Sequence, residues 1–79
     1  MYSTRYNIYG TNRDGNDLLI DCSFDNKPIA LDCLIHYINF IALKHGIKIW
    51  KDDDIRNILN ANEQYFVGTY TFWIEEEGI

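Results

Sequence analysis

The 79-residue sequence predicts a single α+β domain over residues 1–79, in which one long and one short helix pack on one face of a three-stranded antiparallel sheet. Three observations predict this fold. Two alternating strand patterns flank a turn near the N-terminus, two helical patterns follow, and an aromatic, β-branched segment lies near the C-terminus. A right-handed crossover would return the last strand beside the first, which gives the strand order 2-1-3.

The first predicted element is an N-terminal β-hairpin, because apolar and polar residues alternate on both sides of the segment TNRDGND. A two-residue Asp14-Gly15 loop would pair Ile8 with Asp21 and direct a charge toward the core. A three-residue loop, Arg13-Asp14-Gly15, is therefore predicted, with Gly15 in the left-handed conformation that closes such a turn. The pairs on the buried face are then Ile8 with Ile20 and Tyr6 with Cys22.

A long and almost wholly apolar helix is predicted next, ending at Gly46. Glycine suits the residue just past a helix, and the basic residues before it favour the negative end of the helix dipole. The start of the helix is open between two positions. It lies either near Pro28, with Asp25 or Asn26 as the cap, or at Asp32.

The second half of the chain predicts a short helix and then one long strand. The segment KDDDIRNILNAN predicts the helix, with Asp52 or Asp53 as its cap and one apolar face. Residues 64–75 are aromatic and β-branched, which predicts a single uninterrupted strand. Its odd positions, among them Tyr65 and Trp73, would then share one face of the sheet.

Composition and charge restrict the partners of the protein. Twelve acidic against seven basic residues give a net charge of −5, which argues against direct nucleic-acid binding and favours a protein partner with a basic surface. The N-terminus lacks a signal-peptide pattern, and the longest apolar run is too short to span a bilayer. Cys22 and Cys33 are expected to be buried thiols in a reducing compartment, so a cytoplasmic location without membrane contact is expected.

Neither an active site nor a metal site is predicted. The sequence contains no G-x-S-x-G motif, no phosphate-binding glycine loop and no Cys/His metal spacing. Asp32, His36 and Asn39 share one side of the long helix, and we interpret them as its narrow polar stripe. Residues 52–54 cannot converge on one ion, because neighbouring helical residues point about 100° apart. Residues 75–77, all glutamates, are interpreted as a solvated tail, and no catalytic residue, metal or cofactor is expected.

The long helix has two apolar stripes, and only one of them can face the sheet. The sheet-facing stripe is Leu31, Leu34, Ile35, Ile38, Ile41 and Ala42. The second stripe, formed by Cys33, Tyr37 and Phe40, lies roughly opposite. Either the short helix covers it or another copy of the chain does, and the sequence leaves both alternatives open. In the second case these three residues mediate self-association to a homodimer.

The sheet face away from the helices is the predicted partner-binding surface. Asp17, Asp21 and Asp25 are spaced four apart on the second strand, so all three would point to this face about 13 Å apart. Tyr65 and Trp73 are expected on the same face, and such side chains often anchor protein interfaces. These five residues form the predicted binding site for a basic protein surface.

In its small size, acidity, Tyr and Asn content and α+β build, the chain resembles the small phage-encoded inhibitors, including anti-CRISPR proteins. The resemblance extends over the whole chain but includes no motif, so it assigns no role to a single residue. It implies a non-enzymatic protein that acts in the host cytoplasm by binding a host effector, often at a basic nucleic-acid-binding site. Two alternatives stay open: a homodimeric structural or adaptor protein, and an acidic immunity or antitoxin protein that blocks a basic nuclease.

Overall fold

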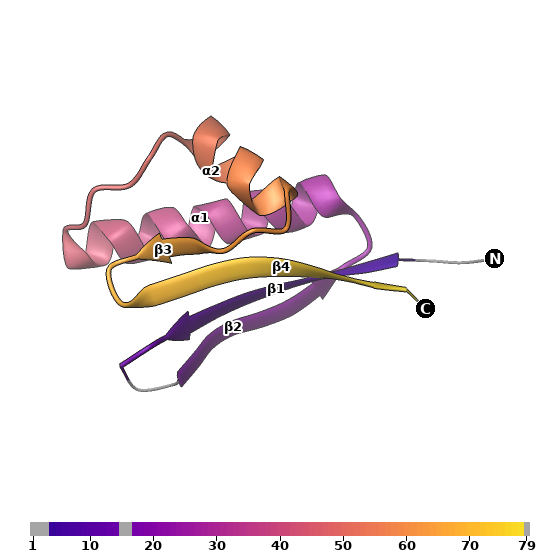
Figure 1. Ribbon diagram of the computed structural model, residues 1–79, viewed down its shortest axis with the longest axis horizontal. Helices are drawn as coiled ribbons and strands as arrows, with labels where there is room; N and C mark the ends of the chain where they lie inside the picture. The colour runs from indigo at the N-terminus through magenta and orange to yellow at the C-terminus, as the bar shows by residue number, and fades with distance from the viewer. Residues whose placement is uncertain (1–3, 15–16, 79) are drawn as a thin grey trace.

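The fold is a four-stranded antiparallel sheet with two helices packed on one side of it (Figure 1). The computed structural model describes residues 4–14 and 17–78. Along the chain the elements are β1 (Thr4–Asn12), β2 (Asp17–Phe24), α1 (Lys27–His45), α2 (Asp52–Asn60), β3 (Tyr65–Val67) and β4 (Tyr70–Gly78). The strand order is β2-β1-β4-β3. The predicted α+β class is confirmed, as is the position of the last strand beside the first.

A fourth strand, β3, replaces the first part of the single long strand predicted over residues 64–75. The chain reverses at Gly68 and Thr69, where Gly68 has φ 59° and Val67 pairs with Tyr70 across the turn. A two-residue loop that begins with a left-handed glycine is a hairpin turn matched to the twist of its strands. The prediction of three strands was therefore wrong, because strong strand propensity on both sides of the loop concealed this turn.

The turn also moves Tyr65 to the face opposite the predicted one. Tyr65 pairs with Phe72 and therefore shares its face, toward the helices. Only 7% of Tyr65 is exposed, and its hydroxyl accepts a hydrogen bond from the backbone N–H of Trp50 at 3.1 Å. The placement of Tyr65 on the outer surface was wrong, because the reversal at the turn breaks the simple alternation of odd and even positions.

Strands β1 and β2 form the predicted hairpin, but in a different register. Ile8 pairs with Cys22 and not with Ile20, which pairs with Gly10. A shift by two residues keeps the same side chains toward the helices, so the predicted pairs were wrong although the predicted face is confirmed. Glycine suits position 10, because a Cβ there would lie 2.8 Å from Cγ2 of its β2 partner Ile20 and 2.7 Å from the ring of Phe72 on β4. The predicted turn glycine, Gly15, lies outside the described residues.

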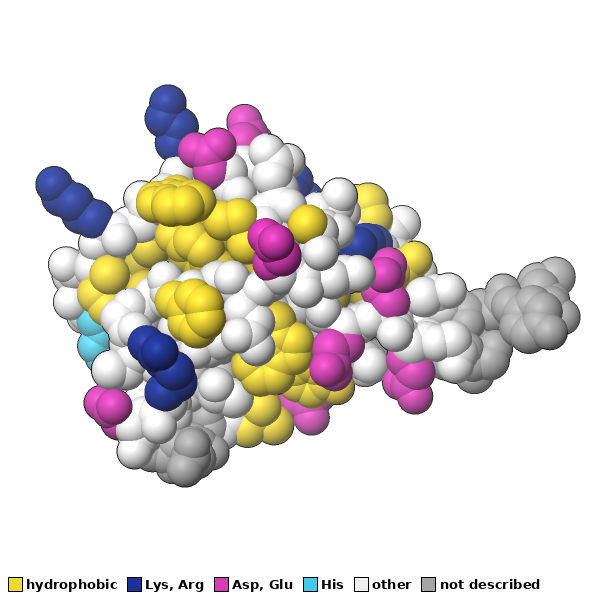
Figure 2. Space-filling model, viewed as in Figure 1, with side chains coloured by type: hydrophobic (Ala, Val, Ile, Leu, Met, Phe, Trp, Pro, Cys, Tyr) yellow, Lys and Arg dark blue, Asp and Glu magenta, His cyan; other side chains and the backbone are white. Residues whose placement is uncertain are grey.

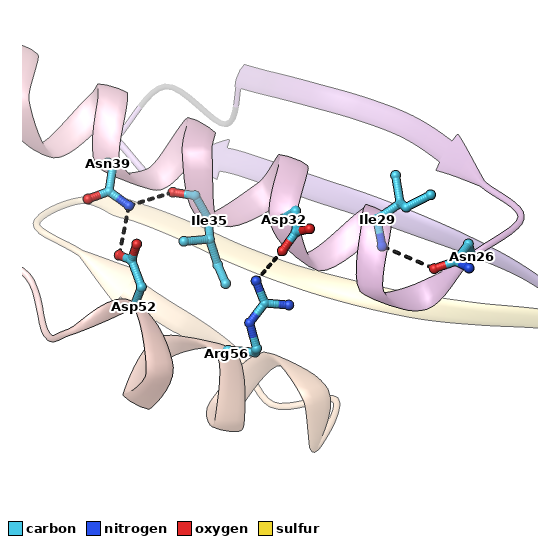
Figure 3. Close-up of polar contacts among 7 residues, drawn as sticks. All are labelled: Asn26, Ile29, Asp32, Ile35, Asn39, Asp52 and Arg56. Carbon is cyan, nitrogen blue, oxygen red and sulfur yellow. Dashed lines mark hydrogen bonds and ion pairs between the residues drawn. The ribbon is translucent and has the colours of Figure 1, made fainter.

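Helix α1 begins at Lys27, which decides the open alternative in favour of the region of Pro28. The Asn26 side chain accepts a hydrogen bond from the N–H of Ile29 at 3.2 Å (Figure 3). Pro28 is tolerated in the first turn, because backbone N–H groups there have no partner within the helix and proline has none to satisfy. At the other end, Gly46 follows the helix as predicted, and it has a left-handed conformation with φ 64°. The predicted sheet-facing residues are all buried: Leu31, Leu34, Ile35, Ile38, Ile41 and Ala42.

Helix α2 packs along the polar stripe of α1. Asp32 on α1 forms an ion pair with Arg56 on α2, and the amide of Asn39 donates to the carboxylate of Asp52 at 3.1 Å (Figure 3). The apolar side of α2 reaches the core through two buried residues, Ile55 and Leu59. The polar stripe is therefore the border of the contact between the two helices, and not simply a solvated surface as expected.

The start of α2 differs from the prediction. Its N-cap is Lys51, which makes no side-chain hydrogen bond to the helix, so the prediction of Asp52 or Asp53 as the cap was wrong. Three acidic residues instead occupy the first turn. There the positive end of the helix dipole favours negative charge, so the acids stabilise the helix start without capping it.

Candidate protein-binding surface

An aromatic pair lies on the two central strands, on the outer face, which is the sheet face away from α1 and α2. The rings of Tyr9 on β1 and Trp73 on β4 are stacked, with 5.4 Å between their centroids and 26° between their planes. The two residues are direct cross-strand partners, and both remain partly exposed. Stacking across the strands holds the rings in one orientation, so the pair presents an ordered apolar surface. The predicted location of Trp73 on this face is confirmed.

Carboxylates flank the Tyr9–Trp73 pair. Asp21 on β2 is the cross-strand partner of Tyr9, and Glu75 and Glu77 follow Trp73 at two-residue intervals on β4. Burial of the Tyr9 phenol raises its pKa, and the negative charges of Glu75, Asp21 and Glu77 raise it further. The acids therefore act on the aromatic pair from both strands that flank β1. The outer face around the pair is acidic, and Arg5 on β1 is the cross-strand partner of Glu77.

A hydrogen-bonded network holds one of these acids in place. The Ser23 hydroxyl donates to Asn7 Oδ1 at 2.6 Å, and Asn7 Nδ2 donates to Glu77 Oε2 at 3.2 Å. Asn7 is only 8% exposed, so a nearly buried amide orients a surface carboxylate. The network joins β2, β1 and β4, and the position of Glu77 on β4 is therefore restrained by residues on the other two strands.

A hollow of about 740 Å³ adjoins the aromatic pair. It is lined by residues of the outer face and by residues of the opposite side of β4: Asn7, Tyr9, Asn62, Gln64, Trp73, Ile74, Glu75, Glu76 and Glu77. A lining drawn from both sides of one strand means that the hollow wraps around the edge of β4. Figure 2 shows acidic side chains beside hydrophobic ones on the side of the molecule where β3 and β4 lie.

The predicted row of three aspartates is interrupted. Asp21 pairs with Tyr9, whereas Asp17 pairs with Asn12, and a β-bulge lies between the two pairs. The extra residue of the bulge disrupts the regular four-residue spacing from which the row was predicted. The side chain of Asp17 lies outside the described part of the structure. Asp25 is exposed just past the end of β2.

The acids that accompany Asp21 on this face were missed by the sequence interpretation. The predicted strand ended at Glu75 and residues 75–77 were interpreted as a solvated tail, but β4 continues to Gly78 and includes Glu77 as well. Their signal was available, since they continue the two-residue alternation that begins at Trp73. Asn7 gave no such signal, because its role depends on a tertiary contact with the other end of the chain.

A second apolar surface surrounds Trp50, in the link between the two helices. Trp50 is 61% exposed and Phe66 on β3 is 53% exposed. Hollows of about 600 and 340 Å³ adjoin Trp50, and their linings include Lys51 and Lys48, respectively. Arg13 lies over the Phe66 ring, 5.2 Å from its centroid, and donates to a carbonyl of the β3–β4 turn at 2.7 Å. This surface, which the sequence did not single out, is therefore bordered by cations together with one acid, Asp54.

The three residues predicted for self-association differ in exposure. Tyr37 packs edge-on against Phe72, with 6.0 Å between ring centroids, and Cys33 is also half-buried against the core. Phe40 is 55% exposed and Leu43, one turn further along α1, is 85% exposed. The sheet thus covers part of the second stripe, while its C-terminal part stays open to solvent.

The two cysteines have different environments. Cys22 is exposed on β2, so the expectation that both thiols are buried was wrong. Cys33 is half-buried on α1. Burial, and to a smaller extent the neighbouring Cys22, raises the pKa of the Cys33 thiol and makes it less reactive.

The structure describes residues 4–14 and 17–78. Within these ranges no group of three or more potential metal ligands is found. Among the described helices, none combines the length and the apolar character needed to cross a bilayer. The chain matches no protein-family model, and comparisons with curated proteins and with solved structures give no match.

Proposed function

We propose that this protein is a non-enzymatic inhibitor that occupies a basic, nucleic-acid-binding surface of a host effector, as anti-CRISPR proteins often do. The observation that supports the proposal is the Tyr9–Trp73 pair flanked by Asp21, Glu75 and Glu77. Stacked rings supply the packed anchor of an interface, and carboxylates complement the lysines and arginines that bind phosphate. A protein that covers those cations keeps nucleic acid away from them.

The order of this surface adds further support. Tyr9 and Trp73 restrain each other by stacking, and the Asn7 amide holds Glu77. Side chains that are ordered before binding lose little conformational entropy on association. The net charge of −5 also attracts a basic partner over a longer range than the direct contacts do.

The proposal is tested by capturing the effector from host extract and measuring association rates at two salt concentrations. Glu75→Lys should slow association strongly at low salt and less at high salt, because exposed charges steer the encounter and are screened beyond about 8 Å at physiological ionic strength. Asp14→Lys is the matched control, since it makes the same charge change at an exposed position in the β1–β2 turn. Equal effects of the two substitutions would overturn the outer face as the binding site.

The identity of the captured partner separates two forms of the proposal. An inhibitor should compete with the nucleic acid for a host effector, so added nucleic acid should release it. An acidic immunity or antitoxin protein would use the same face against a basic nuclease, and the captured protein would then be a nuclease. Both forms predict the same dependence on Glu75 and on salt.

A homodimeric structural or adaptor protein is the second candidate, supported by the exposed Phe40 and Leu43 on α1. Exposed apolar patches of this kind often mark interfaces. The protein should then sediment as a dimer, and Phe40→Glu should give a folded monomer. Tyr37 is not used for this test, because it packs on the core through Phe72. A wild-type monomer at high concentration would eliminate this candidate.

A further inference from the structure

In the part of the chain that the structure describes, the edge of β4 opposite β1 has no partner strand beyond residue 72. Strand β3 pairs only with residues 70–72 of β4, whereas β4 continues to Gly78. Along its other edge, β4 is paired with β1 over its whole length. Within the described residues, the backbone of residues 73–78 therefore has a neighbouring strand on one side only.

The hydrogen-bonding groups on this edge belong to alternate residues. In a two-residue hairpin the residues that flank the loop bond to each other, so Tyr70 directs its N–H and C=O toward β3. By alternation, the same groups of Ile74, Glu76 and Gly78 point to the open side. The open row is about 13 Å long at about 3.3 Å per residue, enough for an added strand of about five residues.

The hollow of about 740 Å³ lies along this row. Its lining includes Ile74 and Glu76 of the edge, together with the Tyr9–Trp73 pair. On the helix side, Glu76 is held by Lys27 at 3.4 Å and by Asn62 at 3.1 Å. A chain segment that enters the hollow from the outer face would therefore meet the strand edge and the aromatic pair together.

We propose that an extended basic segment of the partner adds to the sheet as a strand along residues 74–78. This inference rests on the proposed function and names the element of the partner that is bound. In an added strand, alternate side chains point to the outer face, where Lys or Arg would lie beside Glu75 and Glu77. Backbone hydrogen bonds to Ile74 and Glu76 would supply binding that does not depend on the partner's side chains.

Charge selects this occupant over a second copy of the chain. Two copies joined through their β4 edges would bring residues 75–77 of one close to the same glutamates of the other. Like charges opposite each other destabilise a strand pair, and charged edges prevent edge-to-edge association. A basic segment converts the same positions into opposite-charge pairs.

The first test uses two synthetic peptides with equal charge, one of alternating Lys and Val and one of alternating Lys and Pro. Proline cannot donate to a strand ladder, so only the Lys-Val peptide can add as a regular strand. We expect it to bind at least tenfold more tightly than the Lys-Pro peptide. Its binding should slow amide hydrogen exchange at Ile74 and Glu76, the outward N–H groups. The amides of Glu75 and Glu77 already face β1, so their exchange should change little.

The second test removes one donor of the edge. Glu76→Pro deletes an outward N–H at an edge position that tolerates proline, while Glu76→Gln makes the same charge change and keeps the N–H. The preference for the Lys-Val peptide should disappear in Glu76→Pro and persist in Glu76→Gln. Thermal unfolding checks that both variants fold. If Glu76→Pro does not fold, the exchange measurement on the wild-type protein decides whether the peptide adds as a strand.

Three results distinguish the possible failures. Equal binding of the two peptides, with both weakened by Glu75→Lys, would overturn strand addition and leave the proposed function standing. If Glu75→Lys leaves the binding of both the peptides and the partner unchanged, the proposed function itself is overturned. Protection of the Ile74 and Glu76 amides that rises with protein concentration, without peptide, would identify a second copy as the occupant and overturn the inference.

Discussion

The two faces of the sheet are built from the same strands and have opposite chemistry. On the helix side Ile8, Phe72 and Ile74 are at most 2% exposed. On the outer face their chain neighbours Tyr9 and Trp73 are half-buried and accompanied by carboxylates. Adjacent residues of one strand therefore have different roles. Those on the helix side stabilise the domain, and those on the outer face form the proposed binding surface. The predictions below test this division between the faces.

Phe72→Ala should have the largest effect on stability. The ring is fully buried and packs edge-on against Tyr37, so its removal leaves a cavity between the sheet and α1. Such truncations cost about 3–5 kcal/mol of the free energy of unfolding. Phe66→Ala, the same change at a residue that is 53% exposed on the outer face, is the matched control and should cost far less. Chemical denaturation measures both, and similar losses would contradict the division between the faces.

Gly10→Ala should have the next largest effect, because it overpacks the same part of the core. The added Cβ would lie 2.7 Å from the Phe72 ring and 2.8 Å from Cγ2 of Ile20. Overpacking a core costs about 1–3 kcal/mol. If this clash is the cause, Phe72→Leu should relieve part of it, and the double variant should lose less stability than the sum of the single variants. Additive losses in denaturation experiments would point to another cause.

Trp73→Ala should cost little stability and much binding. Loss of the stacked contact with Tyr9 costs about 1 kcal/mol, to which some lost burial adds. As the anchor of the proposed interface, Trp73 should act mainly on dissociation, so the partner should leave faster while the association rate changes little. Surface binding measurements with the captured partner separate the two rates. An unchanged dissociation rate would remove Trp73 from the interface.

The sequence predicted the fold well where local chemistry decides the structure. Gly46 ends α1 as expected, and the alternation in β1 and β2 identified the buried face. It failed where the fourth strand begins. Only Gly68 interrupts a segment with strong strand propensity, and a lone glycine there fits a strand as well as a turn. The prediction of the β1–β2 register failed for a different reason, since a β-bulge between the Gly10–Ile20 and Thr11–Leu18 pairs shifts the pairing and the regular alternation gives no sign of it.

The candidate surface was predicted only in part, for related reasons. Trp73 and Asp21 lie on the outer face, because the alternation around each of them is regular. Tyr65 lies on the helix side and not on this face, because the turn at Gly68 reverses the chain between Tyr65 and Trp73. Glu77 continues the alternation that begins at Trp73, but its hydrogen bond from Asn7, 70 residues earlier in the chain, could not be recognised from local sequence.

The smallest expected effect concerns the one glutamate of residues 75–77 that lies on the helix side of β4. The hydrogen bond from Asn62, followed by the contact with Lys27, holds the pKa of Glu76 below its usual range and outweighs the opposing effect of burial. A carboxylate whose pKa is lowered by folding stabilises the protein above the pKa of the unfolded chain, about 4.3 for Glu. This contribution is lost as the pH falls through the lower value of the folded state.

Glu76→Gln should therefore lower the melting temperature slightly at neutral pH and less at acidic pH, because the contribution of the charge is lost as the pH falls below the pKa of the unfolded chain and through the lower value of the folded state. The effect is small because the side chain is 38% exposed and solvent screens its contacts. Glu63→Gln, at an exposed position in the turn before β3, is the control and should change little at either pH. If Glu76→Gln lowers the melting temperature equally at both pH values, the loss comes from packing, and the charge of Glu76 does not stabilise the helix side of the β4 edge.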